Sequence, residues 1–161
     1  MLKRSIDIRI FGLAFIVVVF FSIFLLHKTF AIGGLYSLTG SGARGWYGID
    51  TSADGTKVIA ADQSGYIYIS TDSGATWNPQ IGNGITYTGW YAAVDVTPDG
   101  TKFAAASASG YIYYSSNGGT SWTQLTNAGS RNWYGIVLSD DGVNMTASSD
   151  GVFTSTDSGA N

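Results

Sequence analysis

The sequence has no cysteine and no glutamate, and its single histidine, His27, lies near the N-terminus. All eleven acidic residues are aspartates, and only two prolines are present. Without thiolate, imidazole or glutamate groups after residue 31, this part of the chain cannot form a Ser-His-Asp or Cys-His nucleophile system or the usual zinc sites. The absence of cysteine also excludes disulfides, so stability must come from burial and hydrogen bonding.

The N-terminal 31 residues differ in kind from the rest of the chain. Three basic residues precede an apolar run from Ile10 to Leu26, which is interrupted only by Gly12 and Ser22. This run is slightly long for the core of a signal peptide, about 7–15 residues, and short for a spanning helix, which needs about 20. We therefore expect residues 1–31 to be either a signal peptide or an N-terminal membrane anchor, with a hydrophobic helix that precedes the β domain.

Small residues stand at the two positions that a signal peptidase reads in Thr29-Phe30-Ala31. Cleavage after Ala31 is therefore one expectation, and an uncleaved anchor formed by residues 10–26 is the other. Both place the remainder outside the cytoplasm, because the positive charges before the apolar run stay inside. The predicted location is secreted, periplasmic or cell-surface, with the membrane as a partner through the N-terminal segment.

Residues 32–161 are acidic, with four basic residues against ten aspartates and hence a net charge of −6. Nucleic acid is not expected as a partner, because phosphate binding needs a basic face. No cofactor and no metal ion is predicted, since the thiolate and imidazole ligands that most often hold one are missing.

A repeat of about 45 residues runs through residues 46–161. Each copy opens on a Trp-Tyr pair and continues with an Asp-Gly turn, a second glycine turn and a Ser-rich hairpin. The opening pairs are Trp46-Tyr47, Trp90-Tyr91 and Trp133-Tyr134. The Asp-Gly turns are Asp54-Gly55, Asp99-Gly100 and Asp141-Gly142, and the second turns are Ser64-Gly65, Ser109-Gly110 and Asp150-Gly151. Landmarks that recur three times in register indicate a repeat architecture.

The segments between these landmarks have strand length and alternate in character. Tyr66 and Tyr68 would lie on one face of a strand, with Ile67 and Ile69 on the other. The glycine turns would join such strands as hairpins, because glycine accepts a positive φ. Four short antiparallel strands per repeat are typical of a propeller blade. The predicted fold is therefore all-β, an incomplete β-propeller over residues 32–161 with four-stranded blades at about 46–80, 90–125 and 133–161.

The hairpin between the third and fourth strands carries a recurring motif. It reads Ser-Thr-Asp-Ser-Gly-Ala-Thr-Trp from Ser70 to Trp77 and Ser-Ser-Asn-Gly-Gly-Thr-Ser-Trp from Ser115 to Trp122. This pattern resembles the Asp-box, or bacterial neuraminidase repeat, and the resemblance covers residues 46–161. The matching positions are Ser70, Asp72, Gly74, Thr76, Trp77, Ser115, Asn117, Gly119, Ser121, Trp122, Ser155, Asp157 and Gly159. The resemblance implies a β-propeller like those of sialidases, some glycoside hydrolases, sortilin-type receptors and photosystem assembly factors.

We interpret these hairpins as structural devices. A short Asp side chain accepts hydrogen bonds from nearby backbone N–H groups. Gly74 would supply the unusual backbone angle, and Trp77 would cover the hairpin as an apolar plug. The alternative is that Asp72 is a calcium ligand or a catalytic acid. The replacement of this residue by Asn117 in the second copy argues against that alternative.

The third copy stops inside its hairpin at Asn161, one residue before the expected Trp. Propellers close with about 4–8 blades. We therefore expect the third blade to be truncated, so that the sequence is either a fragment of a longer product or one chain of an assembly. Open blade edges would then favour self-association.

The candidate ligand-binding residues open the first strand of each copy. They are Arg44, Trp46, Tyr47, Trp90, Tyr91, Arg131, Trp133 and Tyr134. If these residues ring one face of a propeller, their indole, phenol and guanidinium groups can stack on sugar faces or hold a peptide. The alternative is that the aromatic side chains pack between neighbouring blades, which is their commoner fate.

No catalytic residue is assigned. Sialidase activity is not expected, because residues 32–161 have no Glu and two arginines where a sialidase needs three. Asp50, Asp62 and Asp95 lie within or at the ends of strands, so an enzyme that uses two aspartates stays open as an alternative. The favoured function is an exported or surface-anchored binding or scaffolding module for a glycan or protein ligand. The alternatives are the N-terminal blades of a polysaccharide-acting glycoside hydrolase, and an assembly factor or receptor that binds a protein partner.

Overall fold

The computed structural model describes residues 28–29, 37–63, 65–85 and 91–161, which fall into two units, Met1–Thr39 and Gly40–Asn161. In the first unit, β1 (Lys28–Thr29) pairs antiparallel with β2 (Ser37–Leu38). The 3-10 turn η1 (Thr39–Ser41) follows and includes the last residue of the first unit and the first two of the second. The predicted N-terminal helix and the expected cleavage site lie outside the described residues. Within the described ranges, no helix is long and apolar enough to cross a membrane.

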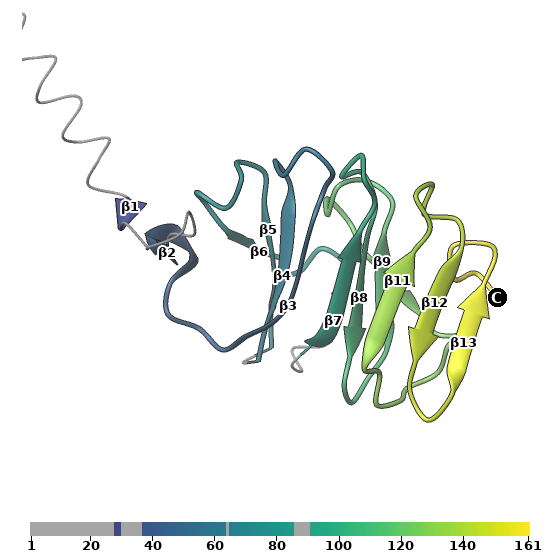
Figure 1. Cartoon of the computed structure of the whole chain (residues 1–161). Helices are drawn as coiled ribbons and strands as arrows, with labels where there is room; N and C mark the ends of the chain where they lie inside the picture. The colour runs from purple at the N-terminus through teal and green to yellow at the C-terminus, as the bar shows by residue number, and fades with distance from the viewer. Residues whose placement is uncertain (1–27, 30–36, 64, 86–90) are drawn as a thin grey trace, which may run out of the picture. The chain divides into compact units, whose positions relative to one another are not determined.

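Residues 40–161 form three antiparallel sheets, which we call blades 1, 2 and 3 (Figure 1). In each blade, neighbouring strands are consecutive along the chain. Blade 1 contains β3 (Trp46–Thr51), β4 (Val58–Asp62), β5 (Ile67–Ser70) and β6 (Asn78–Pro79). Blade 2 contains β7 (Tyr91–Val96), β8 (Phe103–Ser107), β9 (Ile112–Ser115) and β10 (Thr123–Leu125). Blade 3 contains β11 (Gly135–Leu138), β12 (Met145–Ser148) and β13 (Val152–Ser155). The predicted all-β meander architecture is confirmed.

The blades meet through their first two strands. The first strands β3, β7 and β11 contact one another in sequence, and β4 and β8 add contacts to the first strand of the following blade (Figure 1). Because every blade is a meander, its later strands lie progressively farther from this line of contact. Sheets that touch along their first strands and diverge outward have the arrangement of propeller blades around an axis.

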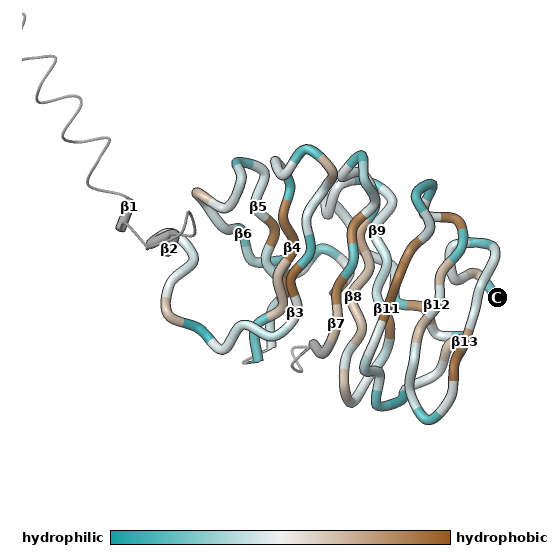
Figure 2. Tube along the Cα trace, in the orientation of Figure 1, coloured by the Kyte–Doolittle hydropathy of each residue, from teal (hydrophilic) through white to brown (hydrophobic). Residues whose placement is uncertain are grey.

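Apolar side chains fill the space between the blades. One buried cluster joins blades 1 and 2 around Ile59, Phe103 and Tyr113, and a second joins blades 2 and 3 around Trp133 and Met145. The hydropathy colouring shows the apolar segments along the strands and the polar ones at the turns (Figure 2). Burial of each large apolar side chain contributes about 1.5–3 kcal/mol. The side chains of these two clusters are buried between neighbouring blades, so each blade depends on its neighbour for this contribution.

The glycine turns agree with the sequence expectation in part. The Asp-Gly turns have positive φ at Gly55, Gly100 and Gly142, with angles of 70°, 66° and 66°. In the second turns the expectation of a positive φ is wrong for Gly110 and Gly151, which do not adopt one. None of the residues around these two glycines has a positive φ either, so both turns are made without the left-handed region.

Candidate functional site

The loops of the blades gather at two ends with different chemistry. We call one the aspartate end, because it holds the Asp-Gly turns and the hairpins that follow the third strands. The two loop types are tied together there, for example by the N–H of Ser73, which donates to the carbonyl of Thr56 at 2.9 Å. We call the other the arginine end, because it holds the residues before the first strands. There the N–H of Gln63 in the second turn donates to the carbonyl of Gly45 at 2.7 Å.

The hairpin motif of blade 1 is closed by its own side chains. Oδ1 of Asp72 accepts hydrogen bonds from the hydroxyl of Ser70 at 2.8 Å and from the N–H of Thr76 at 2.8 Å. Oδ2 of Asp72 accepts the hydroxyl of Thr76 at 2.6 Å. These bonds, led by the Thr76 hydroxyl, lower the pKa of Asp72 to about 2. The indole N–H of Trp77 donates to the carbonyl of Gly74 at 2.9 Å, so the ring lies over the hairpin.

The same hydrogen bonds recur in the other two blades with different side chains. Oδ1 of Asn117 accepts the hydroxyl of Ser115 at 3.0 Å and the N–H of Ser121 at 2.9 Å. Asp157 accepts the N–H of Asn161 at 3.1 Å and its side-chain amide at 2.7 Å. Since a neutral amide replaces the carboxylate in blade 2 without changing the hairpin, the contacts of this position serve the turn itself.

A second set of carboxylates that are hydrogen-bonded within their own turns lies in the Asp-Gly turns. Asp54, Asp99 and Asp141 each accept a hydrogen bond from a Ser or Thr hydroxyl two residues earlier, at 2.7, 2.6 and 2.6 Å. These hydroxyl bonds are the largest cause of the lowered pKa of each carboxyl, which is about 2 for Asp54 and Asp99. This network was not predicted from the sequence, although the spacing Ser/Thr-x-Asp-Gly in all three copies indicates it. Across the described residues, no three carboxylate or imidazole groups converge on a metal site.

The arginine end carries a repeated stack of an indole, a second aromatic ring and a guanidinium. In blade 1, the ring of Trp46 meets that of Tyr68 edge to face at 5.4 Å, and the guanidinium carbon of Arg44 lies 4.6 Å from the centre of the Tyr68 ring. In blade 3, Trp133 and Arg131 hold Phe153 in the same way. The two separations there are 5.2 Å and 4.6 Å.

Each arginine of these stacks also faces a carboxylate, at the end of β4 in blade 1 and in the second turn in blade 3. Nη1 of Arg44 lies 3.8 Å from Oδ2 of the buried Asp62. Nη1 of Arg131 lies 3.4 Å from Oδ1 of Asp150, and the side chain of Asp150 is 76% exposed. An exposed pair of this kind contributes little to stability, about 0–1 kcal/mol. The charged groups of Arg131 and Asp150 are therefore accessible to solvent at little energetic cost.

The predicted ligand-binding residues divide by type. Trp133 is fully buried and Trp46 is half-buried, whereas Tyr47 and Tyr134 are 63% and 62% exposed. Trp90 lies outside the described residues, and for Tyr91 only the backbone in β7 is described. The indole of Trp46 thus packs within blade 1, and that of Trp133 packs in the cluster between blades 2 and 3. The phenols of Tyr47 and Tyr134 are largely exposed to solvent.

A polar pocket of about 350 Å³ opens at the arginine end of blade 3. Its lining consists of Ser130, Arg131, Asn132, Tyr134, Ser149 and Asp150. Two predicted residues, Arg131 and Tyr134, therefore lie together at one cavity with a carboxylate opposite. From the sequence, Asp150 was predicted only as a turn residue. Its place in the pocket wall depends on the contact of the second turn with the residues before the first strand.

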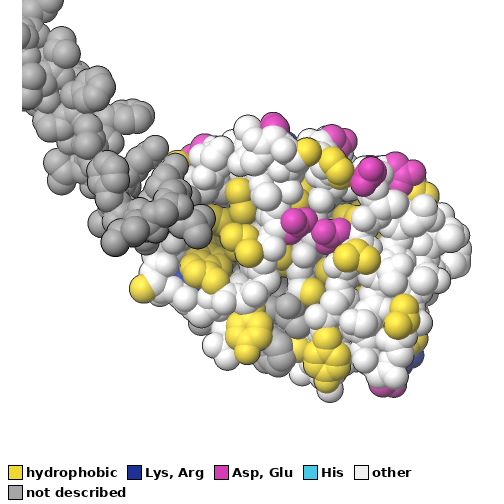
Figure 3. Space-filling model, in the orientation of Figure 1, with side chains coloured by type: hydrophobic (Ala, Val, Ile, Leu, Met, Phe, Trp, Pro, Cys, Tyr) yellow, Lys and Arg dark blue, Asp and Glu magenta, His cyan; other side chains and the backbone are white. Residues whose placement is uncertain are grey.

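Two aspartates of the first strands lie at the boundary between blades. Oδ2 of Asp50 accepts the N–H of Val96 at 2.9 Å, and Oδ2 of Asp95 accepts the N–H of Leu138 at 2.5 Å. Each blade thereby holds the first strand of the next. Burial, with the neighbouring carboxyl of Asp50 as a further cause, raises the pKa of Asp95 to about 6. Figure 3 shows that acidic side chains lie along one rim of this face and that two others lie next to each other in its middle.

Comparison with solved structures places this arrangement among known folds. The GH74 enzyme of Niastella koreensis is 27% identical over 71% of this chain and 17% of its own, with a TM-score of 0.53. YCF48 bound to a D1 peptide and YCF48 from Cyanidioschyzon merolae are 17% and 16% identical over 73% of this chain, with TM-scores of 0.59 and 0.58. The described blades form part of a β-propeller. This partial propeller spans 17% to 40% of the length of these three neighbours. No family model and no curated protein matches the chain.

Proposed function

We propose that the chain is an exported or surface-anchored propeller module that binds its ligand at the arginine end of blade 3. The observation that carries the proposal is the polar pocket in which the exposed Tyr134 lies with Arg131 and Asp150. Export or anchoring rests on the apolar run of residues 10–26 and its preceding basic residues. We assign the hairpins of the three blades to the Asp-box repeat, with a structural role for Asp72, Asn117 and Asp157.

The chemistry of the pocket fits a glycan. An exposed phenol ring offers an apolar face on which a sugar ring can stack. The guanidinium of Arg131, the amide of Asn132 and the carboxylate of Asp150 supply donors and acceptors for sugar hydroxyls within one cavity. The similarity to the GH74 enzyme supports this ligand class. At the same relative position in blade 1, Arg44 and Tyr47 repeat the guanidinium and the exposed phenol.

A binding assay with the full chain in mild detergent tests this proposal. The chain is applied to an array of plant, bacterial and animal glycans, and affinity for each glycan bound is measured by calorimetry. Tyr134→Ala should weaken binding about tenfold or more, because it removes the stacking face. Val137→Ala is the matched control. Like Tyr134, Val137 is exposed, but it lies on β11 and does not line the pocket. Equal loss in both variants, or no glycan bound by the native chain, would contradict the proposal.

A protein ligand is the second candidate, because the neighbour YCF48 is seen with a bound D1 peptide. In that case the chain should co-purify with one protein partner and give no glycan signal, and Tyr134→Ala should release the partner while Val137→Ala retains it.

Hydrolysis is the third candidate, favoured by the raised pKa of Asp95 beside Asp50. A raised pKa is what a general acid requires, and a paired aspartate is what completes a glycosidase site. Release of reducing ends from a bound polysaccharide, abolished by Asp95→Asn, would establish it. We favour binding alone, because both carboxylates already accept hydrogen bonds from the backbone of the next blade.

A further inference from the structure

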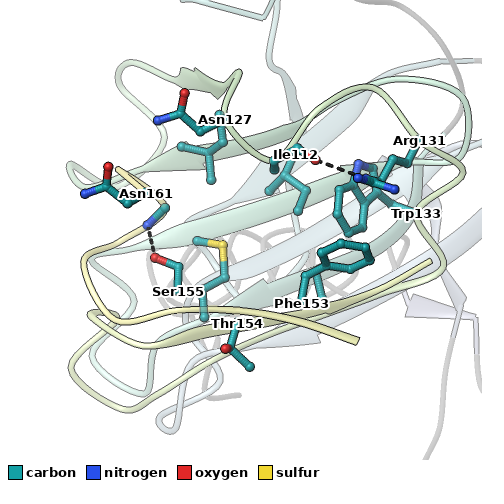
Figure 4. A pocket seen from close by; sticks show the side chains of 13 residues that line it. Ile112, Asn127, Arg131, Trp133, Phe153, Thr154, Ser155 and Asn161 are labelled. Carbon is teal, nitrogen blue, oxygen red and sulfur yellow. Dashed lines mark hydrogen bonds between the residues drawn. The ribbon is translucent and has the colours of Figure 1, made fainter. Parts of the chain in front are cut away.

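Blades 1 and 3 carry the same group of side chains at the arginine end. We call these groups patch 1 (Arg44, Trp46, Tyr47 and Tyr68) and patch 3 (Arg131, Trp133, Tyr134 and Phe153). In both, the guanidinium carbon lies 4.6 Å from the centre of the ring on the third strand, and the tryptophan ring meets that ring at 79° or 78°. Figure 4 shows Arg131 next to Trp133 and Phe153. Nε of each arginine donates to the carbonyl three residues earlier at 3.2 Å, so the guanidinium is fixed in the same way in both blades.

The groups that solvent reaches also agree between the two patches. The side chain of Arg44 is 41% exposed and that of Arg131 is 39% exposed. The tyrosines Tyr47 and Tyr134 are both largely exposed. Blade 2 follows patch 1 along the chain and precedes patch 3, and it contacts the first strands of both blades. A neighbouring blade on either side therefore leaves these side chains accessible, so their exposure is a property of their position in the blade.

The charges of each patch are balanced locally. Arg44 faces the carboxylate of Asp62, and Arg131 faces that of Asp150. Residues 32–161 have four basic residues against ten aspartates, a net charge of −6. An anionic polymer would find no excess positive charge at the patches and would be repelled by the chain as a whole. The guanidinium donors suit the hydroxyl groups of an uncharged sugar, and the phenol suits the apolar face of its ring.

The two patches are separated by one whole blade. The first strands β3, β7 and β11 contact one another in sequence, so blade 2 lies between the patches (Figure 1). Packed sheets lie about 10 Å apart, so the patches are separated by roughly 20 Å. In blade 2 the sequence keeps the Trp-Tyr pair but has Thr88 where the other two blades have arginine. A ligand that contacts both guanidinium groups must therefore extend across a blade, which requires a chain of several sugars.

We propose that patches 1 and 3 bind one uncharged linear polysaccharide, which crosses blade 2 between them. This inference rests on the proposed glycan-binding function and gives it two sites on the chain instead of one. A polysaccharide held at one patch meets the other at a high effective concentration, so both contacts form although each alone is weak. Affinity should therefore rise in a step once the polysaccharide is long enough to reach both patches, because shorter chains occupy only one.

The test measures binding of oligosaccharide length series to the full chain in mild detergent by calorimetry. The probes run from disaccharide to hexasaccharide in β-1,4-linked glucan, mannan, xylan and N-acetylglucosamine, with oligogalacturonate as the anionic comparison. The native chain should bind at least one neutral series, and the longest members should bind about tenfold or more tightly than the shortest. Tyr47→Ala and Tyr134→Ala should each remove this gain with length, because one intact patch binds short and long chains alike.

Ile49→Ala and Val137→Ala are the matched controls, since both residues are exposed on the first strands of the same two blades but belong to neither patch. Both controls should keep the gain with length, and circular dichroism checks the folding of every variant. A gain that survives in a folded Tyr47→Ala variant, or equal affinity of the native chain for short and long members, would overturn the inference and leave the single site of blade 3. Tighter binding of oligogalacturonate than of every neutral series would also overturn it. A native chain that binds none of the series would contradict the proposed function itself.

Discussion

Replacing Asp95 with Asn tests how blades 2 and 3 are joined. In the native chain its carboxylate accepts the N–H of Leu138 at 2.5 Å, while the carboxylate of Asp50 next to it accepts the N–H of Val96. Burial and the neighbouring Asp50 raise the pKa of Asp95 to about 6. The amide oxygen of Asp95→Asn can accept the same hydrogen bond without a charge. The variant should therefore keep the contact between blades and lose the charge repulsion.

The sign of the pH dependence follows from the direction of the pKa change. Because the pKa of Asp95 is higher in the folded state than its ordinary value of 3.8, the folded state holds the proton more tightly. This stability is fully present below about pH 4 and is lost as the pH rises through about 6. For a fully buried carboxyl the change would be worth about 3 kcal/mol. Asp95 is only half-buried, so solvent screening reduces the expected value to about 1 kcal/mol.

The assay is urea unfolding of the full chain in mild detergent, followed by tryptophan fluorescence between pH 4.5 and 7.5. These limits, set by the pKa of Asp95, exclude the acid range in which the aspartate-end carboxylates lose their own stabilising effect. The native chain should lose about 1 kcal/mol across this range, and Asp95→Asn should be about 1 kcal/mol more stable than native at pH 7.5, with a flat profile. A variant that is less stable than the native chain at pH 7.5, or that keeps the native pH profile, would refute the reasoning.

Two further predictions concern the hairpin of blade 2 and are read from the free energy of unfolding in urea. Ser115→Ala leaves the buried N–H of Gly119 without its 2.9 Å acceptor and should cost about 1–3 kcal/mol, whereas the exposed control Ser116→Ala should change stability by less than about 0.5 kcal/mol. Gly119→Ala would place a Cβ 2.3 Å from Cδ1 of Ile69 at a φ of 85° and should cost more than about 2 kcal/mol. The control Gly118→Ala has a φ of 68°, but its added Cβ would have no neighbouring atom closer than 3.9 Å, so it should cost only the backbone strain of about 1 kcal/mol. Equal losses of stability in the two glycine variants would contradict the packing argument.

The strands were predictable because the repeat marks their ends. The first strand was expected to start at Trp46, and β3 does; the second was expected at Val58–Ala61, and β4 runs from Val58 to Asp62. These positions follow from local rules, since turn residues and the alternation of side chains act within one blade. The fourth strands were expected to begin at Trp77 and Trp122, and β6 and β10 begin one residue later, at Asn78 and Thr123. In β6 the strand has only two residues and ends at Pro79, which has no N–H to donate to a ladder.

Contacts between blades were not predictable from the pattern. The indole of Trp122 donates to the side chain of Gln80 in the connection from blade 1, and Asp50 and Asp95 hold the first strand of the following blade. These partners lie more than forty residues apart, at 42, 46 and 43 positions, and no local signal links them. For the same reason, the Trp and the Tyr of each opening pair were predicted together as ligand-binding residues. Burial separates them in blade 3, where the Trp133 ring is buried and the Tyr134 ring is exposed.

The two ends of the blades differ in what a ligand would have to displace. At the aspartate end, Asp54, Asp72 and Asp99 each accept bonds from hydroxyl and backbone groups of their own turn. A ligand that took these oxygens would break turn hydrogen bonds, each worth about 0.5–1.5 kcal/mol or more when a charge is involved. At the arginine end, Tyr134 is exposed, and Arg131 is held by one exposed ion pair, a carbonyl at 3.2 Å and its stack on the Phe153 ring. A ligand at the arginine end would therefore displace fewer hydrogen bonds of the fold than one at the aspartate end. This difference is why we propose recognition at the arginine end, although the motif that identifies the repeat lies at the opposite end.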